Sequence, residues 1–224
     1  MKNIMSFIKF IIFCYIYKLT DRTFVADGKK FSYFYHPHGS WANERCVEVA
    51  IGKQCIKYYK PEDVLEIGNV ISMYQPVFHT VVDKYDKQMG VINEDVVDFN
   101  TKKKYGLILS LSTLEHVGFD ETVGIKLNDA DKIPHAIENL KKCLAENGKL
   151  IVTMPLGYNP NLDKRIKDDT LGFTNEYFLK RVSTSNRWKQ IKKEDITDIK
   201  FGYPYLKANG LFIGVYTKLG VKEK

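Results

Sequence analysis

The chain has 224 residues, of which 44% are hydrophobic and 27% charged, a balance that excludes a disordered or fibrous protein. Its net charge is +7, from 34 basic and 27 acidic residues, so an acidic or nucleic-acid partner is permitted but not required. The four cysteines lack C-x-x-C spacing, which argues against a zinc site or a disulfide framework and favours a reducing, cytoplasmic compartment.

The chain begins with an apolar segment. Residues 4–17 are almost wholly apolar, with Lys9 inside the segment and Lys18 after it. The segment is too short for a bilayer-spanning helix, which needs about 20 apolar residues, and no small-residue signal-peptide cleavage site follows it. Three interpretations stay open: an interfacial helix in peripheral contact with a membrane, a helix docked on the domain or on a second subunit, and, least favoured, a cleaved signal peptide.

The next segment, residues 24–39, combines aromatic and turn residues with two histidines, His36 and His38. A His-x-His pair could bind a metal, but no third ligand is nearby, so we expect no metal site and interpret the segment as a lid or loop. Apolar residues then recur at helical spacing and predict an amphipathic helix over residues 41–58, with Ser40 as its N-cap.

Short apolar runs bounded by turn residues predict the strands of an α/β sheet. The expected strands are residues 64–67, 78–83, 91–93, 107–111, 150–155, 188–191 and 211–216. Further helices are expected over residues 134–146, ended by Gly148, and over residues 174–182. This order predicts a single Rossmann-like domain with a mostly parallel seven-stranded sheet and an antiparallel C-terminal strand pair.

Three regions follow from these elements. We expect an N-terminal apolar helix in residues 1–22, a lid and first helix in residues 23–60, and the core domain in residues 61–224. Only residues 84–90 separate the second and third strands, which leaves no room for a full crossover helix. Residues 156–172 are polar and are expected to form a loop.

Acidic residues end or follow three successive strands: Glu66, Asp83 and Asp95. Ligands of open α/β sheets bind beyond the carboxyl ends of the strands, and Gly68 would let a ligand approach the backbone. A carboxylate after the second strand accepts ribose hydroxyls, and one after the third can accept the adenine amine. The layout predicts an adenosine ligand, and a crevice lined by carboxylates suits a cationic sulfonium. The chain has neither a G-x-G-x-x-G motif nor a phosphate-binding lysine motif.

Five motifs in this order resemble the class I S-adenosylmethionine-dependent methyltransferases, specifically the type 11 group. They are Val64–Gly68, Val82-Asp83, Glu94–Val96, Ser112–Val117 and Leu140–Leu150 with Pro155. The resemblance covers about residues 40–155. It implies S-adenosyl-L-methionine as cofactor, bound by Glu66, Ile67, Gly68, Asn69, Asp83, Asp95, Val96 and Ser112.

The first loop departs from the family pattern. The family carries further glycines where this chain has Val70 and Ser72. A β-branched residue with positive φ would be strained by roughly 1–2 kcal/mol or more. The loop is therefore expected either to take another shape or to bind the cofactor more weakly.

The resemblance also places a group near the transferred methyl. His116 is the candidate general base, and its alternative is a purely structural role at a helix start. His36, His38, Arg45 and Tyr158 are expected to shape the acceptor site, although Arg45 has the alternative of pairing with a nearby glutamate at the surface. Three functions stay open: an O-methyltransferase for a small molecule or glycan, an RNA methyltransferase, and a non-catalytic binding protein of this fold.

Overall fold

The computed structural model describes residues 2–17, 22–119 and 129–220. Its main sheet has eight strands in the order β5-β4-β3-β6-β7-β10-β8-β9. The strands are β3 (Val64–Ile67), β4 (Thr80–Val82), β5 (Val91–Ile92), β6 (Tyr105–Leu111), β7 (Leu144–Pro155), β8 (Asn175–Arg181), β9 (Trp188–Ile191) and β10 (Gly210–Thr217). Strands β5 to β7 are parallel, whereas β10, β8 and β9 are antiparallel to their neighbours.

This arrangement confirms the Rossmann-like methyltransferase fold predicted from the sequence, with one strand more than expected. Strand β3 shows why a short, continuous apolar run predicts a strand of this sheet. Val64 packs in one hydrophobic cluster, and Leu65 and Ile67 pack in another, because both faces of the strand are covered. The expected absence of a crossover helix between β4 and β5 is also confirmed.

The additional strand is β8, and it corrects a prediction. Residues 174–182 were expected to be helical, but residues 175–181 pair with β10 on one side and β9 on the other. Strand β8 therefore separates β9 from β10, which were expected to pair directly. The helical periodicity was misleading because Phe178 and Leu179, adjacent in sequence, are buried in different clusters on the two faces of the sheet.

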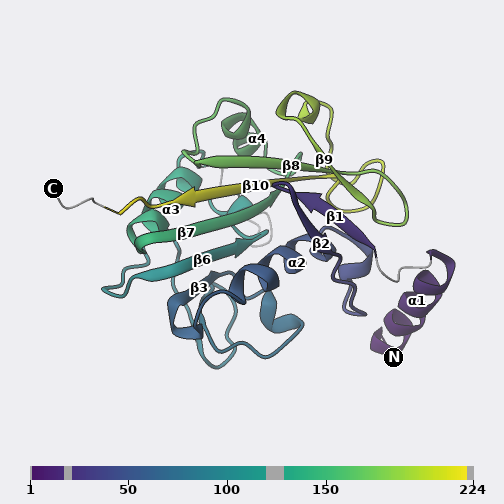
Figure 1. Ribbon diagram of the computed structural model, residues 1–224, viewed down its shortest axis with the longest axis horizontal. Coiled ribbons are helices and arrows are strands. Elements are labelled where there is room, and N and C mark those ends of the chain that lie inside the picture. The colour runs from purple at the N-terminus through teal and green to yellow at the C-terminus, as the bar shows by residue number, and fades with distance from the viewer. Residues whose placement is uncertain (1, 18–21, 120–128, 221–224) are drawn as a thin grey trace.

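Helices cover both faces of the sheet (Figure 1). Helix α2 (Arg45–Ile56) packs on one face, while α3 (Lys132–Lys142) and α4 (Pro160–Lys167) contribute to the cluster on the other. A hairpin of β1 (Thr23–Ala26) and β2 (Lys29–Ser32) lies on the α2 side, where Phe24 and Ala26 are buried. Residues 23–32 are therefore part of the covering layer rather than a free loop.

The helix boundaries differ from the predicted ones. A 3-10 turn at Ser40–Ala42 precedes α2, so Ser40 does not cap it; instead its hydroxyl accepts from the N–H of His36 and donates to the carbonyl of Phe34. The helix expected over residues 134–146 ends at Lys142 because the chain from Leu144 onwards pairs with β6.

Helix α4 occupies part of the segment expected to be a loop. The side chain of Asn159 accepts from the N–H groups of Asn161 and Leu162, and Pro160 opens the helix. This Asn-Pro pair was the sequence signal for the helix start that the prediction missed.

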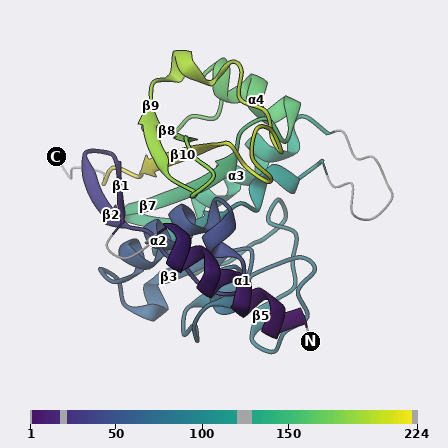
Figure 2. The same cartoon turned by 90° about the vertical axis from the view of Figure 1, so that its right-hand side faces the viewer.

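Helix α1 (Lys2–Tyr17) lies outside the sheet layers, at the side of the molecule (Figures 1 and 2). The hydroxyl of Ser6 donates to the carbonyl of Pro37 over 2.7 Å, and the rings of Phe13 and Trp41 lie 4.7 Å apart. Of the helices in the described ranges, none is long and apolar enough to cross a membrane.

Candidate active site

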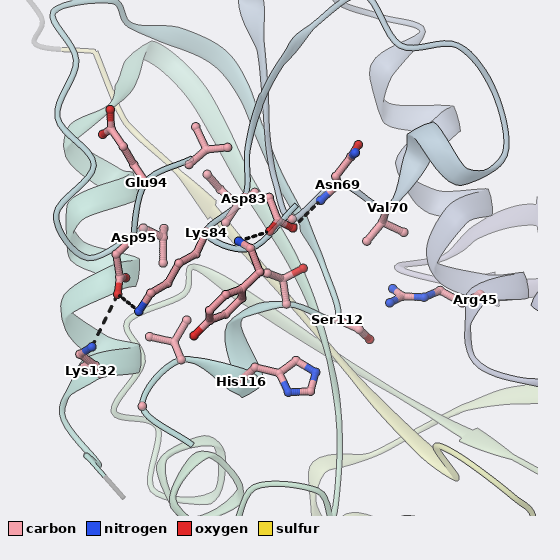
Figure 3. A pocket seen from close by; sticks show the side chains of 18 residues that line it. Arg45, Asn69, Val70, Asp83, Lys84, Glu94, Asp95, Ser112, His116 and Lys132 are labelled. Carbon is pink, nitrogen blue, oxygen red and sulfur yellow. Dashed lines mark hydrogen bonds and ion pairs between the residues drawn. The ribbon is translucent and has the colours of Figure 1, made fainter. Parts of the chain in front are cut away.

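A cavity lies where the parallel strands end. Strands β3, β4, β5 and β6 run in the same direction, so their carboxyl ends meet at one edge of the sheet. The cavity at this edge has a volume of about 340 Å³ and falls at the lower end of the range of small-ligand sites. It is lined by Arg45, Ile67, Gly68, Asn69, Val70, Val82, Asp83, Lys84, Tyr85, Glu94, Asp95, Val96, Ser112, Thr113, His116, Val117, Gly118 and Lys132 (Figure 3).

Most of the residues expected to bind a cofactor come together here. Those that line the cavity are Ile67, Gly68, Asn69, Asp83, Asp95, Val96 and Ser112. The expected base His116 and the expected acceptor residue Arg45 also line it. Glu66, His36, His38 and Tyr158 do not, and their positions are described below.

Glu66 shapes the loop after β3 instead of reaching the cavity. Its side chain is fully buried, and its Oε1 accepts from the N–H groups of Val70 and Ile71 over 3.0 and 2.9 Å. Its Oε2 lies 2.7 Å from Nε2 of His79. Both oxygens thus have protein partners, and the carboxylate holds the loop that passes under the cavity.

Gly68 occupies a position that no other residue fits. Its φ is +82°, and a Cβ there would lie 2.1 Å from Oγ1 of Thr113. The loop after β3 and the loop after β6 therefore meet through this glycine. The strain expected at Val70 does not arise because its φ is −93°. The cofactor affinity of this loop stays a prediction.

Asp83 is held by backbone donors at the end of β4. Its Oδ1 accepts from the N–H groups of Tyr85 and Asp86 over 2.8 and 2.9 Å, and its Oδ2 accepts from that of Asn69 over 3.1 Å. Among the described residues, Oδ2 has this one donor, so a lone pair remains for a ligand. Asn69 is fixed in turn, since its Nδ2 donates to Asp86 over 2.8 Å.

Asp95 is paired with two lysines that the sequence analysis missed. Nζ of Lys84 lies 2.9 Å and Nζ of Lys132 lies 3.6 Å from Oδ2 of Asp95 (Figure 3). Partial burial would raise the pKa of Asp95, but the Lys84 hydrogen bond, the Val97 N–H and the two ammonium charges together lower it. Neither lysine belongs to a motif, and Lys132 comes from α3, so only the fold brings them together.

Arg45 pairs with a buried glutamate beneath the cavity. Its Nη1 lies 3.0 Å from Oε2 of Glu48 and 3.0 Å from the carbonyl oxygen of Leu111. Oε1 of Glu48 accepts from the hydroxyls of Ser112 over 2.5 Å and Thr153 over 2.6 Å. Ser112 has a positive φ of 40°, so this network holds strained backbone at the cavity wall. The ion pair is thus buried, not at the surface as the alternative for Arg45 supposed.

His116 lies between a tyrosine and a glutamate. The Tyr158 hydroxyl is 3.2 Å from Nδ1 of His116, and Oε1 of Glu115 is 3.8 Å from Nε2. Tyr158 is positioned by its neighbour Asn159, whose Nδ2 donates to the Glu115 carbonyl over 2.9 Å. Although Tyr158 does not line the cavity, it contacts the ring that does.

Glu115 was not predicted as a site residue. It is 1% exposed, and its Oε2 has no hydrogen-bond partner within the described part of the chain. Burial, followed by the charge of Glu48, raises the pKa of Glu115 well above its usual value. The protein thus favours the protonated form of this carboxyl group more than water does.

The two histidines of the 24–39 segment lie outside the cavity. His36 and His38 stack with ring centroids 5.0 Å apart, and His36 also meets the edge of Tyr74 at 5.5 Å. Burial, followed by the charge of His38, lowers the pKa of His36. In the described ranges no group of three His, Cys, Asp or Glu side chains could hold a metal ion.

No protein-family model matches the chain, and no curated protein matches it. Similar solved structures include the N-methyltransferase NodS from Bradyrhizobium japonicum WM9 with S-adenosyl-L-homocysteine, at 13% identity and TM-score 0.47, covering 78% of this chain and 87% of that chain. A SAM-dependent methyltransferase from Archaeoglobus fulgidus has 12% identity and TM-score 0.47, covering 78% and 94%. The sugar N-methyltransferase KedS8 from Streptoalloteichus sp. has 12% identity and TM-score 0.38, covering 75% and 86%. These neighbours are methyltransferases, and the strand arrangement of the chain itself is that of the Rossmann-like methyltransferase fold.

Proposed function

We propose that the chain is an S-adenosylmethionine-dependent methyltransferase that O-methylates a small molecule or a glycan. The observation that carries the proposal is the position of Asp83. Three backbone N–H groups fix its carboxylate at the end of β4, and it lines the same cavity as Gly68. A fixed carboxylate at this place in an α/β sheet suits the two hydroxyls of a ribose.

The rest of the cavity suits the adenosine part of the cofactor. Ile67, Val82 and Val96 give it apolar walls that suit a purine ring. Asp95 was the expected partner of the adenine amine, but it already accepts from Lys84. Its neighbour Glu94 lines the cavity and has no ion-pair partner in the described ranges. We therefore assign the adenine amine to Glu94, or to Glu94 and Asp95 together.

The bound cofactor supplies a methyl carbon activated by a sulfonium. The chain then has to align the acceptor and remove its proton, and alignment can supply about 7–11 kcal/mol of the barrier. His116 lines the cavity and its imidazole is suited to accept the proton; Nδ1 lies 3.2 Å from the Tyr158 hydroxyl and Nε2 lies 3.8 Å from Oε1 of Glu115. Tyr158 would thus act as a positioning residue for the base.

The surroundings of His116 suit a ring-shaped acceptor. The Tyr158 ring meets the edges of His116, Phe119 and Phe201 at centroid distances of 5.1, 5.9 and 5.1 Å. These rings do not line the cavity itself but flank His116, which does, and aromatic side chains with a few polar groups are usual around a site for a small hydroxylated ligand. Arg45 at the same cavity could donate to an acceptor hydroxyl.

Two measurements test the proposal. Calorimetry with S-adenosyl-L-homocysteine should give saturable heat, and its absence at millimolar ligand would contradict both cofactor binding and the enzyme. Incubation with methyl-labelled cofactor and fractionated cell extract should label a small-molecule or glycan fraction. Label in a salt-sensitive RNA fraction would instead favour an RNA methyltransferase. Binding without label in any fraction would favour a non-catalytic protein of this fold.

A further inference from the structure

Helix α1 carries a concentration of exposed apolar side chains. Seven of its large apolar residues are between 50% and 85% exposed: Ile4, Met5, Phe7, Ile8, Ile11, Ile12 and Tyr15. Soluble monomers rarely expose so many contiguous apolar residues without a partner, so this face is a candidate interaction surface.

These side chains share one face of the helix. At 3.6 residues per turn they span an arc of about 160°. The opposite side of the helix meets the body of the protein, through Ser6 on the carbonyl of Pro37 and Phe13 on the ring of Trp41. The helix is therefore held by its inner side, and the exposed apolar arc is on the side away from these contacts.

The charges of this segment have one sign. Lys9 is exposed at the border of the apolar arc, and Lys2 and Lys18 stand before and after the core of the segment in the sequence. The first acidic residue of the chain is Asp21, and the net charge of the whole chain is +7. An apolar face with basic residues and no acidic ones is complementary to an anionic lipid surface.

A second copy of the chain fits this face less well. A 16-residue helix offers a strip about 24 Å long and about 10 Å wide. Such a strip falls short of the ~800 Å² per partner that a standard interface buries. The segment also has no acidic residue that could pair with Lys9 of a second copy.

We propose that α1 lies flat in the interfacial region of an anionic lipid bilayer and holds the protein at a membrane surface. The apolar arc enters the boundary between headgroups and acyl chains, while Lys9 stays at the headgroup level. The Ser6 and Phe13 contacts connect this anchor to Pro37 and Trp41, in the segment before Arg45. The proposal does not depend on methyl transfer.

A fluorescent reporter on the full chain tests insertion directly. Tyr15, 85% exposed on the arc, is replaced by tryptophan, and the matched control replaces Tyr58, which is 75% exposed and lies two residues after α2. Both variants keep Trp41 and Trp188. With vesicles of phosphatidylcholine and phosphatidylglycerol, Tyr15→Trp should show blue-shifted emission that Tyr58→Trp does not show. An equal response of both variants, or none, would overturn the proposal.

Co-sedimentation with the same vesicles tests the face itself. The double variant Ile8→Asp/Ile11→Asp should bind at least about tenfold more weakly than the parent, whereas Leu206→Asp, at a side chain 82% exposed elsewhere, should bind like the parent. Binding should also fall with added salt and on pure phosphatidylcholine vesicles. Unchanged binding of the double variant would contradict the proposal. So would a concentration-dependent dimer that the double variant abolishes, because a second copy would then cover the face.

Discussion

The hydroxyl of Tyr158 lies 3.2 Å from Nδ1 of His116, and the two rings meet nearly edge to face at a centroid distance of 5.1 Å. The tyrosine follows β7 and the histidine follows β6, so the pair joins the ends of two neighbouring strands. The contact fixes the orientation of the imidazole ring at the cavity wall.

Replacing His116 separates a catalytic role from a structural one. If the imidazole removes the acceptor proton, His116→Ala should lower turnover by about 10²–10⁴-fold while leaving cofactor affinity nearly unchanged. Turnover of the parent should rise with pH as the imidazole loses its proton, and that dependence should vanish in the variant. Wild-type turnover with an unchanged pH profile would leave alignment as the only contribution of the site.

Tyr158→Phe provides the matched comparison. This variant keeps the ring contacts with His116 and removes the hydroxyl that lies 3.2 Å from Nδ1. Loss of this contact should reduce turnover less than His116→Ala does and should shift the pH profile. A profile identical to that of the parent would show that the hydroxyl does not position the base.

Asp83→Ala should weaken binding of S-adenosyl-L-homocysteine by about 1.5–3 kcal/mol, the range of charge-assisted hydrogen bonds. The measurement is calorimetry at constant pH and salt. Asp98→Ala is the control, because Asp98 is exposed and does not line the cavity. If the fold is intact and affinity is unchanged, Asp83 does not bind the ribose, and Asp86 becomes the next candidate.

Gly68→Ala tests the close approach of the two loops. A Cβ at this residue would lie 2.1 Å from Oγ1 of Thr113, so either the loop or Thr113 has to move. We expect loss of stability and of cofactor binding, measured by thermal unfolding and calorimetry. Gly90→Ala is the control: φ at Gly90 is +90°, but nothing lies within 4 Å of a Cβ there. The control should therefore lose only the roughly 1–2 kcal/mol of stability that a positive φ costs an alanine.

Glu115→Gln should change how stability depends on pH. The raised pKa of Glu115 means that the folded state binds its proton more tightly than the unfolded state does. Its stabilising contribution is therefore fully present below the unfolded value of about 4.3 and is lost as the pH rises through the raised folded value.

The glutamine variant mimics the uncharged acid and removes this dependence. Its stability relative to the parent should thus increase with pH by up to about 1.4 kcal/mol per pH unit across that window. Denaturant unfolding at a series of pH values gives the difference. A constant difference between the two proteins would show that folding does not raise the pKa of Glu115.

The sequence predicts those parts of the site that directly follow a strand. Gly68 and Asp83 each follow an apolar run, and parallel strands bring such positions to one edge. The lysine pairs of Asp95 could not be predicted in this way, because Lys132 is brought to the cavity by α3. Glu66 was expected from its motif to bind the cofactor. The motif did not reveal that its carboxylate accepts hydrogen bonds from loop N–H groups instead.

Strand β8 shows a limit of periodicity as a guide to the fold. A strand covered on both faces has no alternation between apolar and polar residues, and its short apolar run can also fit one face of a helix. Only pairing with β10 and β9 decides between the two.

The carboxylate of Glu48 joins three elements beneath the cavity: α2 through Arg45, the end of β6 through Ser112 and β7 through Thr153. On this side the cavity wall is held by several buried hydrogen bonds. Lys84 lines the cavity elsewhere and is half-exposed, so water and salt ions weaken its ion pair with Asp95. We therefore expect ligands to enter and leave on the Lys84 side, with exchange rates that increase with ionic strength.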